Sequence, residues 1–194
     1  MAPFFRETLQ KNGIKKKTKI NMDIKNFEFK AKVDDIEKYE SKLLTLNPIF
    51  KGLDYQTDTY FNVREGRLKL REGNIENSLI NYDRENVFGS KESQIILYQH
   101  EPNVALKNIL TKQLGVKIIV SKKRKIYFID NVKFHFDLVE RLGTFIEVEA
   151  IDNKQEFTIE VLKEQCNKYF SFFELTEQNI VDKSYSDLIL ELSK

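Results

Sequence analysis

Residues 120–150 read VSKKRKIYFIDNVKFHFDLVERLGTFIEVEA, and this stretch decides the predicted fold. Three strand-like runs, at about 116–128, 132–139 and 145–151, are separated only by the turns Asp130-Asn131 and Leu142-Gly143. Turns of this length join antiparallel strands, because a parallel pair needs a crossover of a dozen or more residues. The three runs are therefore predicted to form an antiparallel sheet.

The rest of the chain extends this pattern. Five more strand-like runs occur earlier, at about 24–33, 55–63, 67–72, 79–85 and 94–99. Apolar stripes with helical spacing predict four helices, at 34–46, 103–114, 156–170 and 184–192. In the first of these, Asp34 and Glu37 are predicted to form a capping box. Eight antiparallel strands and four helices predict an α+β fold with a large sheet that can close on itself.

The composition limits the class of protein. The chain has 194 residues, of which 41% are hydrophobic and 32% charged, with one cysteine and two histidines. Such a length and mixture predict one globular domain, and so few thiols and imidazoles exclude a dense Cys/His zinc site. No apolar run approaches the ~20 residues of a membrane span, and no signal-peptide pattern is present. A cytoplasmic location without membrane contact is expected.

The first 21 residues differ from the remainder in charge. Residues 1–21 carry six lysines and arginines against a single glutamate. We interpret this segment as a solvated, disordered extension, because charge runs are usually of that kind. A nucleic-acid contact is the alternative. The sequence thus predicts a basic extension over 1–21 and one folded domain over 22–194.

Charged side chains recur at every second position of several predicted strands. The pattern is present in 26–32, 67–71, 133–138 and 147–149, where the intervening residues are mostly apolar. An antiparallel sheet with one solvated face gives the same alternation. Against that interpretation, these faces carry full charges that are sorted by strand. If the sheet closes, the charged faces meet in one interior.

A closed interior with many unpaired charges is costly unless a ligand or water compensates them. Bases can bind a polyanion through charge-assisted hydrogen bonds; the candidates are Lys30, Arg67, Lys69, Arg71, Arg84, Lys122 and Arg124. Acids can hold Mg²⁺ or Mn²⁺, which prefer oxygen ligands; the candidates are Glu28, Asp137, Glu147 and Glu149. Bases together with metal-binding acids favour a triphosphate. A nucleic-acid groove would instead place stacking aromatic residues beside the bases.

The order of these motifs resembles that of the CYTH domain family, the triphosphate-tunnel enzymes, from Asp23 to Leu190. The stretches that carry the resemblance are Asn26-Phe27-Glu28-Phe29-Lys30, 56–61, 66–71, Tyr82-Asp83-Arg84, 120–124, 135–137 and 143–149. A further stretch, 184–188, is similar to one in members labelled class IV adenylyl cyclase. The resemblance implies an eight-stranded antiparallel β-barrel or tunnel with flanking helices. The chain departs from the family's E-x-E-x-K motif because Asn26 stands at the first glutamate.

The resemblance also implies a role for each matching residue. The metal ligands would be Glu28, Asp137, Glu147 and Glu149, and the catalytic set would be Glu28, Lys30, Arg124, Glu147 and Glu149. The phosphate-binding residues would be Lys30, Arg71, Arg84, Lys122 and Arg124, with Arg67, Lys69 and Lys133 beside them. His135 would contact either the ligand or a neighbouring side chain. Asn26 would remove a charged ligand and so weaken metal binding.

Three functions remain open on these residues. A class IV adenylyl cyclase converts ATP to cyclic AMP and pyrophosphate, and the resemblance favours this function. A triphosphatase, which hydrolyses inorganic or organic triphosphate such as thiamine triphosphate, would use the same tunnel. A non-catalytic module that binds a phosphate ligand is the third. Mg²⁺ or Mn²⁺ is the expected cofactor. The expected partners are a nucleoside or inorganic triphosphate and a second copy of the chain in a homodimer, with no specific nucleic acid.

Overall fold

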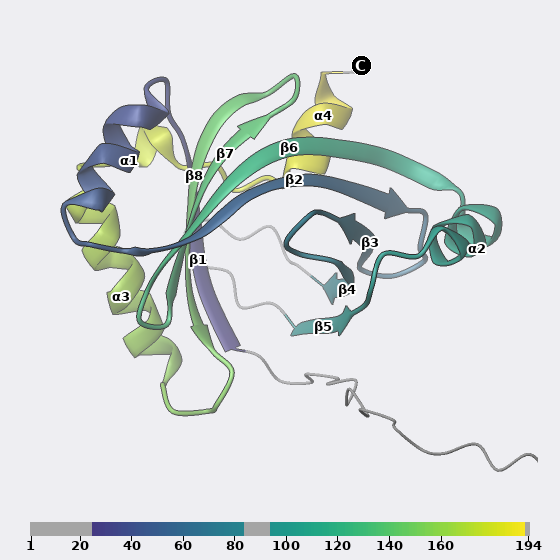
Figure 1. The fold of residues 1–194 in the computed structure, drawn as a ribbon, viewed down its shortest axis with the longest axis horizontal. Helices are drawn as coiled ribbons and strands as arrows, with labels where there is room; N and C mark the ends of the chain where they lie inside the picture. The colour runs from purple at the N-terminus through teal and green to yellow at the C-terminus, as the bar shows by residue number, and fades with distance from the viewer. Residues whose placement is uncertain (1–24, 84–93, 193–194) are drawn as a thin grey trace, which may run out of the picture.

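Eight antiparallel strands form one sheet in the computed structural model, which describes residues 25–83 and 94–192 (Figure 1). The strands are β1 (Lys25–Lys32), β2 (Ile49–Phe61), β3 (Arg67–Glu72), β4 (Ser78–Asp83), β5 (Gln94–Gln99), β6 (Val116–Ile129), β7 (Val132–Val139) and β8 (Gly143–Asp152). Their order across the sheet is β1-β8-β7-β6-β2-β3-β4-β5. The predicted antiparallel pairing is confirmed for every neighbouring pair. The sheet curls into a half-barrel, with β1 and β5 at the two ends of the strand order.

The long strands β2 and β6 produce the curl. They pair along most of their length and arch over β3, β4 and β5 (Figure 1). The ladder between them is interrupted by register shifts at Phe50/Gly52 and at Tyr60/Phe61. Such irregularities bend a strand and increase its twist. At the first shift Gly52 adopts a φ of 141°, which side chains rarely tolerate. The prediction that this strand starts near Tyr55 was wrong, because the bulge lets the ladder continue back to Ile49.

Two helices cover the outer face of β1, β8 and β7. These are α1 (Ile36–Leu44) and α3 (Ile159–Phe172), which lie together on one side of the sheet (Figure 1). Asp35, rather than the predicted Asp34, caps α1 by accepting a hydrogen bond from the backbone N–H of Lys38 at 3.0 Å. The predicted capping box of Asp34 with Glu37 was therefore wrong, because the cap is Asp35 and the residue three positions later is Lys38.

The main core lies between these helices and the sheet. Phe134 and Phe136 of β7 point toward α3, and the ring of Phe134 meets that of Tyr169 edge-on at 4.6 Å between centroids. Burying each such aromatic side chain contributes about 1.5–3 kcal/mol. Because alternate residues point to opposite faces, this packing directs the intervening charged residues of β7 to the inside of the half-barrel.

The remaining helices lie at the ends of the half-barrel. α2 (Val104–Leu114) lies beyond one end of β2 and β6, and α4 (Tyr185–Glu191) follows a short 3₁₀ helix at Glu177–Asn179 (Figure 1). Tyr185 and Ile189 of α4 pack with Val120 and Phe145 of the sheet. Val120 lies on the same face of β6 as Lys122 and Arg124. α4 therefore covers one end of the interior.

The predicted elements are confirmed in the part of the chain that the structure describes. All four helices and all eight strands occur near the predicted positions. β2 begins at Ile49 rather than near Tyr55, and the other described ends shift by at most a few residues. No helix among these residues is long and apolar enough to cross a membrane. The predicted basic extension over 1–21 lies outside the described residues, as does Arg84.

Candidate active site

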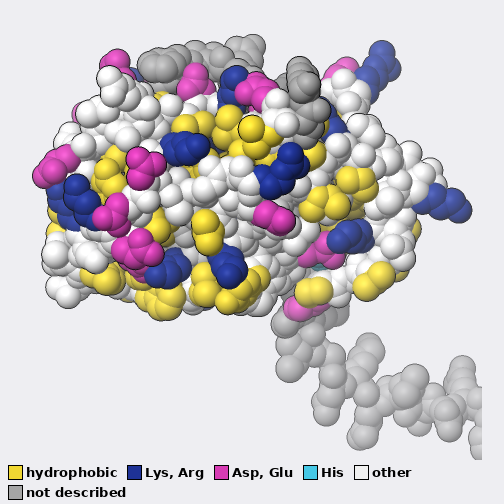
Figure 2. All heavy atoms as spheres, turned by 90° about the horizontal axis from the view of Figure 1, so that it is seen from above, with side chains coloured by type: hydrophobic (Ala, Val, Ile, Leu, Met, Phe, Trp, Pro, Cys, Tyr) yellow, Lys and Arg dark blue, Asp and Glu magenta, His cyan; other side chains and the backbone are white. Residues whose placement is uncertain are grey.

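The charged strand faces converge on one cavity of about 560 Å³ inside the half-barrel. Predicted site residues that line this charged cavity are Glu28, Lys30, Lys69, Arg71, Lys122, Arg124, Lys133, His135, Glu147 and Glu149. Several of them are almost fully buried: Lys122 is 5% exposed and Arg124 is 3% exposed. The alternative of one solvated sheet face is therefore wrong for these strands. On the outer face seen in Figure 2, acids and bases lie interspersed rather than gathered by sign.

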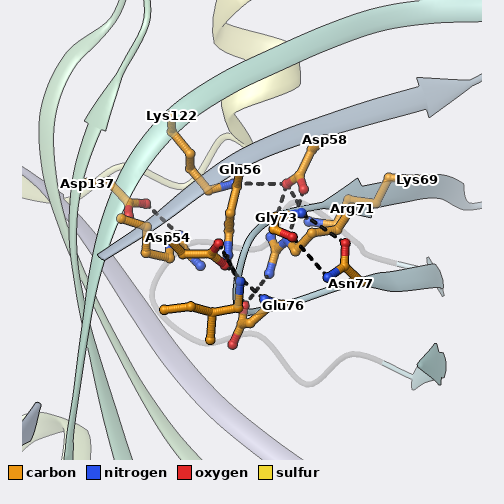
Figure 3. Close-up of polar contacts among 12 residues, drawn as sticks. Asp54, Gln56, Asp58, Lys69, Arg71, Gly73, Glu76, Asn77, Lys122 and Asp137 are labelled. Carbon is orange, nitrogen blue, oxygen red and sulfur yellow. Dashed lines mark hydrogen bonds and ion pairs between the residues drawn. The ribbon is translucent and has the colours of Figure 1, made fainter. Parts of the chain in front are cut away.

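A buried carboxylate organises the basic side of the cavity. Asp58 of β2 is 2% exposed and accepts hydrogen bonds from Arg71 at 2.8 and 3.0 Å, from Lys122 at 2.9 Å and from Lys69 at 3.2 Å (Figure 3). We call Lys69, Arg71 and Lys122 the basic cluster. Burial opposes ionisation of Asp58, but the positive charges of Arg71 and Lys122 outweigh it and hold the pKa of this carboxyl well below its usual value. Asp58 therefore fixes three cations in position.

Lys122 is the cation of the basic cluster whose pKa is lowered. Burial disfavours its charged form, and although Asp58 opposes this effect, the pKa of Lys122 is lowered to about 7. Arg71 and Arg124 nearby lower it further by repulsion. An anion placed beside Lys122 would favour the protonated ammonium. The charge of this lysine is thus sensitive to ligand binding near neutral pH.

Arg124, which the resemblance assigned to phosphate binding, is bound to carboxylates in the wall of the cavity. Its guanidinium donates two hydrogen bonds to Asp137 and a third to Glu147 at 3.0 Å. The Tyr185 hydroxyl donates to Asp137 at 2.9 Å. Asp137 is fully buried and does not line the cavity. The structure therefore places Asp137 as a partner of Arg124 and Tyr185, not among the carboxylates that could reach a metal.

Three carboxylates form the acidic side of the cavity. Glu28 of β1 lies opposite Glu149 of β8 in the strand register, and Glu147 lies two residues before Glu149 on the same face. Burial raises the pKa of Glu149, and although Lys133 opposes this, the nearby Glu28 and Glu147 raise it further. Carboxylates this close to one another are stabilised when they share a proton or bind a cation.

Asn26 stands beside this acidic side. Its Nδ2 donates to Glu149 Oε1 at 2.8 Å, while its buried Oδ1 has no hydrogen-bond partner among the described residues. Within 25–83 and 94–192, no three carboxylates, histidines or cysteines are grouped closely enough to hold a metal by themselves. Mg²⁺ commonly binds one or two carboxylates and completes its shell with substrate phosphates and water. These oxygen donors therefore fit a divalent metal that binds together with a triphosphate.

His135 lies between the acidic and basic sides. It is 2% exposed, and neither ring nitrogen has a hydrogen-bond partner in the described part of the chain. Burial, reinforced by the positive charges of Arg124 and Lys133, lowers the pKa of His135 well below its usual value. The ring is therefore neutral, with one donor and one acceptor nitrogen. Both ring nitrogens can therefore form hydrogen bonds with a ligand.

Arg67 is a predicted phosphate-binding residue that lies outside the charged cavity. Arg67 donates to Ser184 at 2.8 Å and pairs with Asp187 at 2.9 Å, so it holds the start of α4 and lines a separate, smaller hollow. Lys30 lines the charged cavity, and its ammonium lies 4.4 Å from the centre of the Tyr185 ring. Arg84 cannot be placed because it lies outside the described residues.

An apolar wall adjoins the basic cluster, and the sequence patterns assigned it no role. Ile80 and Tyr82 of β4 and Ile95 and Leu97 of β5 line the cavity, with Tyr60 of β2 beside them. The ammonium of Lys69 lies 5.6 Å from the ring centre of Tyr60 and 5.8 Å from that of Tyr82. The wall therefore offers apolar and aromatic surface next to the cations, as an organic group attached to a polyphosphate would need.

Sequence reasoning also missed two acidic residues of the site. Asp58 follows Asp54 and Gln56 at two-residue spacing, so the alternation along β2 could have revealed an inward polar face. Glu76 lies in the turn between β3 and β4 and pairs with Arg71 at 3.1 Å and with Lys133. A turn has no alternation, so no sequence signal pointed to Glu76.

Comparisons with known proteins agree with this fold. The CYTH domain matches residues 25–182, and the chain belongs to the CYTH domain family. A protein of Methanocaldococcus jannaschii, provisionally named an adenylate cyclase, is 29% identical over 173 residues, which cover 83% of this chain and 96% of that protein. The family membership confirms the resemblance seen in the motifs.

Solved structures show the same fold at lower identity. A Pyrococcus horikoshii protein is 24% identical, with a TM-score of 0.71 over 84% of this chain and 98% of its own. A Hippeastrum protein is 12% identical, with a TM-score of 0.59 over 87% of this chain and 95% of its own. The Hippeastrum protein is provisionally named an adenylyl cyclase and is described as revealing a dominant triphosphatase activity.

Proposed function

We propose that this chain is a metal-dependent enzyme of the class IV adenylyl cyclase type, which converts ATP to cyclic AMP and pyrophosphate. One observation carries the proposal: basic, acidic and apolar surfaces line the same cavity of about 560 Å³. The basic cluster suits the phosphates, the acidic side suits a divalent metal, and the wall of β4 and β5 suits a nucleoside. The 29% identical relative that is named an adenylate cyclase supports this choice.

The residues would act mainly by positioning and by stabilising charge. Lys69, Arg71 and Lys122 would hold phosphate oxygens through charge-assisted hydrogen bonds. Glu28, Glu147 and Glu149 would hold Mg²⁺ or Mn²⁺, with Asn26 Oδ1 as a neutral oxygen beside them. When bound, such a metal would supply positive charge that stabilises the transition state and the leaving pyrophosphate. In the reaction the ribose 3′-oxygen bonds to the α-phosphorus, the bond from that phosphorus to pyrophosphate breaks, and the hydroxyl proton passes to solvent water.

Triphosphate hydrolysis is the second candidate. The Hippeastrum protein shares the fold, and its printed activity is dominated by triphosphatase despite its cyclase name. The same basic cluster and acidic side could position a water molecule against the terminal phosphorus. Within one fold, function depends on the site rather than on the architecture. This reaction would not need the apolar wall.

Incubating the protein separately with ATP and with inorganic triphosphate, each with Mg²⁺ or Mn²⁺, tests the proposal. Formation of cyclic AMP and pyrophosphate from ATP supports the cyclase function. Release of orthophosphate without cyclic AMP overturns it and supports the triphosphatase. Tight binding without turnover would identify a binding module, which the hydrogen bond from Asn26 to Glu149 would then help to explain. A protein that neither binds nor converts either compound refutes all three functions.

A further inference from the structure

The side chain of Glu76 places a carboxylate inside the charged cavity. It belongs to the turn between β3 and β4, yet its carboxylate contacts Arg71 of β3 (Figure 3). It also contacts Lys133 of β7. In the sheet order, β6 and β2 lie between β7 and β3. The side chain of Glu76 therefore reaches across the interior of the half-barrel and joins cations from two separated strands.

The turn that carries Glu76 is fixed by a buried anchor. Asp54 is fully buried and accepts hydrogen bonds from the backbone N–H groups of Ile75 at 2.9 Å and Glu76 at 3.0 Å. Asn77 exchanges hydrogen bonds with the backbone of Gly73 at 3.0 and 2.9 Å. A side chain on Gly73 would come within 2.5 Å of Asp54 Oδ1, so only glycine allows this close approach. These contacts aim Glu76 into the cavity.

The carboxylate occupies hydrogen-bonding groups that a phosphate would need. Two nitrogens of Arg71 donate to Asp58, and the third donates to Glu76, so all three are engaged. Burial opposes ionisation of Glu76, but the charges of Lys133 and Arg71 outweigh it and hold its pKa far below the usual range. A carboxylate and a phosphate offer similar oxygen acceptors to these cations.

We propose that Glu76 is a tethered counter-anion, which holds Arg71 and Lys133 in the ligand-free protein and which a polyphosphate displaces when it binds. This inference rests on the proposed function, because it takes a polyphosphate as the ligand of the cavity. An anion that binds between these two cations competes with Glu76 for them. The cost of displacing Glu76 is a property of the protein, so it is the same for a short and a long phosphate chain. Weakly binding anions are thereby kept out of the site.

The experiment measures the affinity of inorganic triphosphate and of orthophosphate by titration calorimetry, with a chelator present to exclude metal. Glu76→Gln keeps the size of the side chain and removes its charge. Displacing the uncharged glutamine costs less than displacing the carboxylate of Glu76. A difference of one charge-assisted hydrogen bond raises the affinity for the added anion by about 10- to 100-fold. The same factor is expected for both anions.

Glu72→Gln is the matched control. Glu72 ends β3 and pairs with Lys107 of α2 at 2.6 Å, outside the charged cavity. The affinity of the Glu72→Gln variant for both anions is therefore expected to equal that of the wild type. Wild-type or weaker affinity of Glu76→Gln overturns the inference while the proposed function stands. Binding by Glu76→Gln but not by the wild type supports the inference. If neither protein binds triphosphate, either with chelator or with added Mg²⁺, the proposed function fails, and the inference fails with it.

A measurement on the wild-type protein avoids dependence on the folding of a variant. In the free protein the N–H groups of Ile75 and Glu76 are held by Asp54. Displacement of the Glu76 side chain should change the surroundings of these two amides and shift their NMR resonances when triphosphate saturates the site. Resonances that stay in place at saturation would refute displacement.

Discussion

Replacing Asp58 by asparagine would remove the charge that holds the basic cluster together. The carboxylate is 2% exposed and lies within 3.2 Å of nitrogens from Lys69, Arg71 and Lys122. Removing one partner of a buried ion pair costs about 3–5 kcal/mol, because the remaining charge is left uncompensated. Each kcal/mol shifts Tm by about 2–4 °C in a domain of this size, so Asp58→Asn is expected to lower Tm by roughly 6–20 °C.

Circular dichroism during heating and during urea unfolding would measure this loss. Glu72→Gln, which breaks a partly exposed ion pair with Lys107, serves as control and should change Tm little. Inorganic triphosphate should raise Tm more in Asp58→Asn than in the wild type, because its charge replaces the missing carboxylate. If the Asn variant unfolds at the wild-type temperature and urea concentration, Asp58 does not hold these three cations.

The pH dependence of stability is a second measurement on the Asp58→Asn variant. The pKa of Asp58 is depressed in the folded protein, so its contribution to stability is present above the unfolded pKa of about 3.9 and is lost as pH falls further, through the folded pKa. The wild type should therefore lose more stability than Asp58→Asn on acidification below about pH 4. Parallel acid profiles of the two proteins would contradict the depressed pKa.

Three further predictions concern other parts of the cavity. Gly73→Ala should lower stability by about 1–3 kcal/mol in urea unfolding, because the new methyl group meets Asp54 at 2.5 Å; an unchanged midpoint would show that the turn can relax. Lys122, whose pKa is about 7, should take up a proton when triphosphate binds, and affinity should fall as pH rises above 7. Calorimetry at about pH 8 in buffers of different ionisation enthalpy would show this uptake, and Lys122→Arg should abolish it, since arginine stays charged; equal uptake in the variant would assign the proton to the ligand. Glu147→Ala should abolish metal-dependent turnover while the protein still melts cooperatively, and an active variant with unchanged metal dependence would exclude Glu147 as a metal ligand.

The sequence alone determined which side chains share one face of each strand. Strands alternate with a period of two, so the charged positions of 26–30, 67–71, 122–124 and 147–149 fell on one face as soon as the strands were located. Short turns then settled the antiparallel pairing. The order of the motifs then indicated the CYTH domain family. These features are local, so they could be read without knowing how the sheet curls.

Only the tertiary structure decided how the inward residues pair. Arg67, Asp137 and Arg124 all point inward, yet Arg67 binds the start of α4 and Asp137 is enclosed by Arg124 and Tyr185. The partners of these residues depend on their position along the strand and on where α4 covers the interior. The alternation of residue types encodes neither feature. Glu76 enters the cavity from a turn fixed by Asp54, a contact between residues 22 positions apart in the chain. The sequence thus determines the face on which a side chain lies, and the curl of the sheet determines its neighbours.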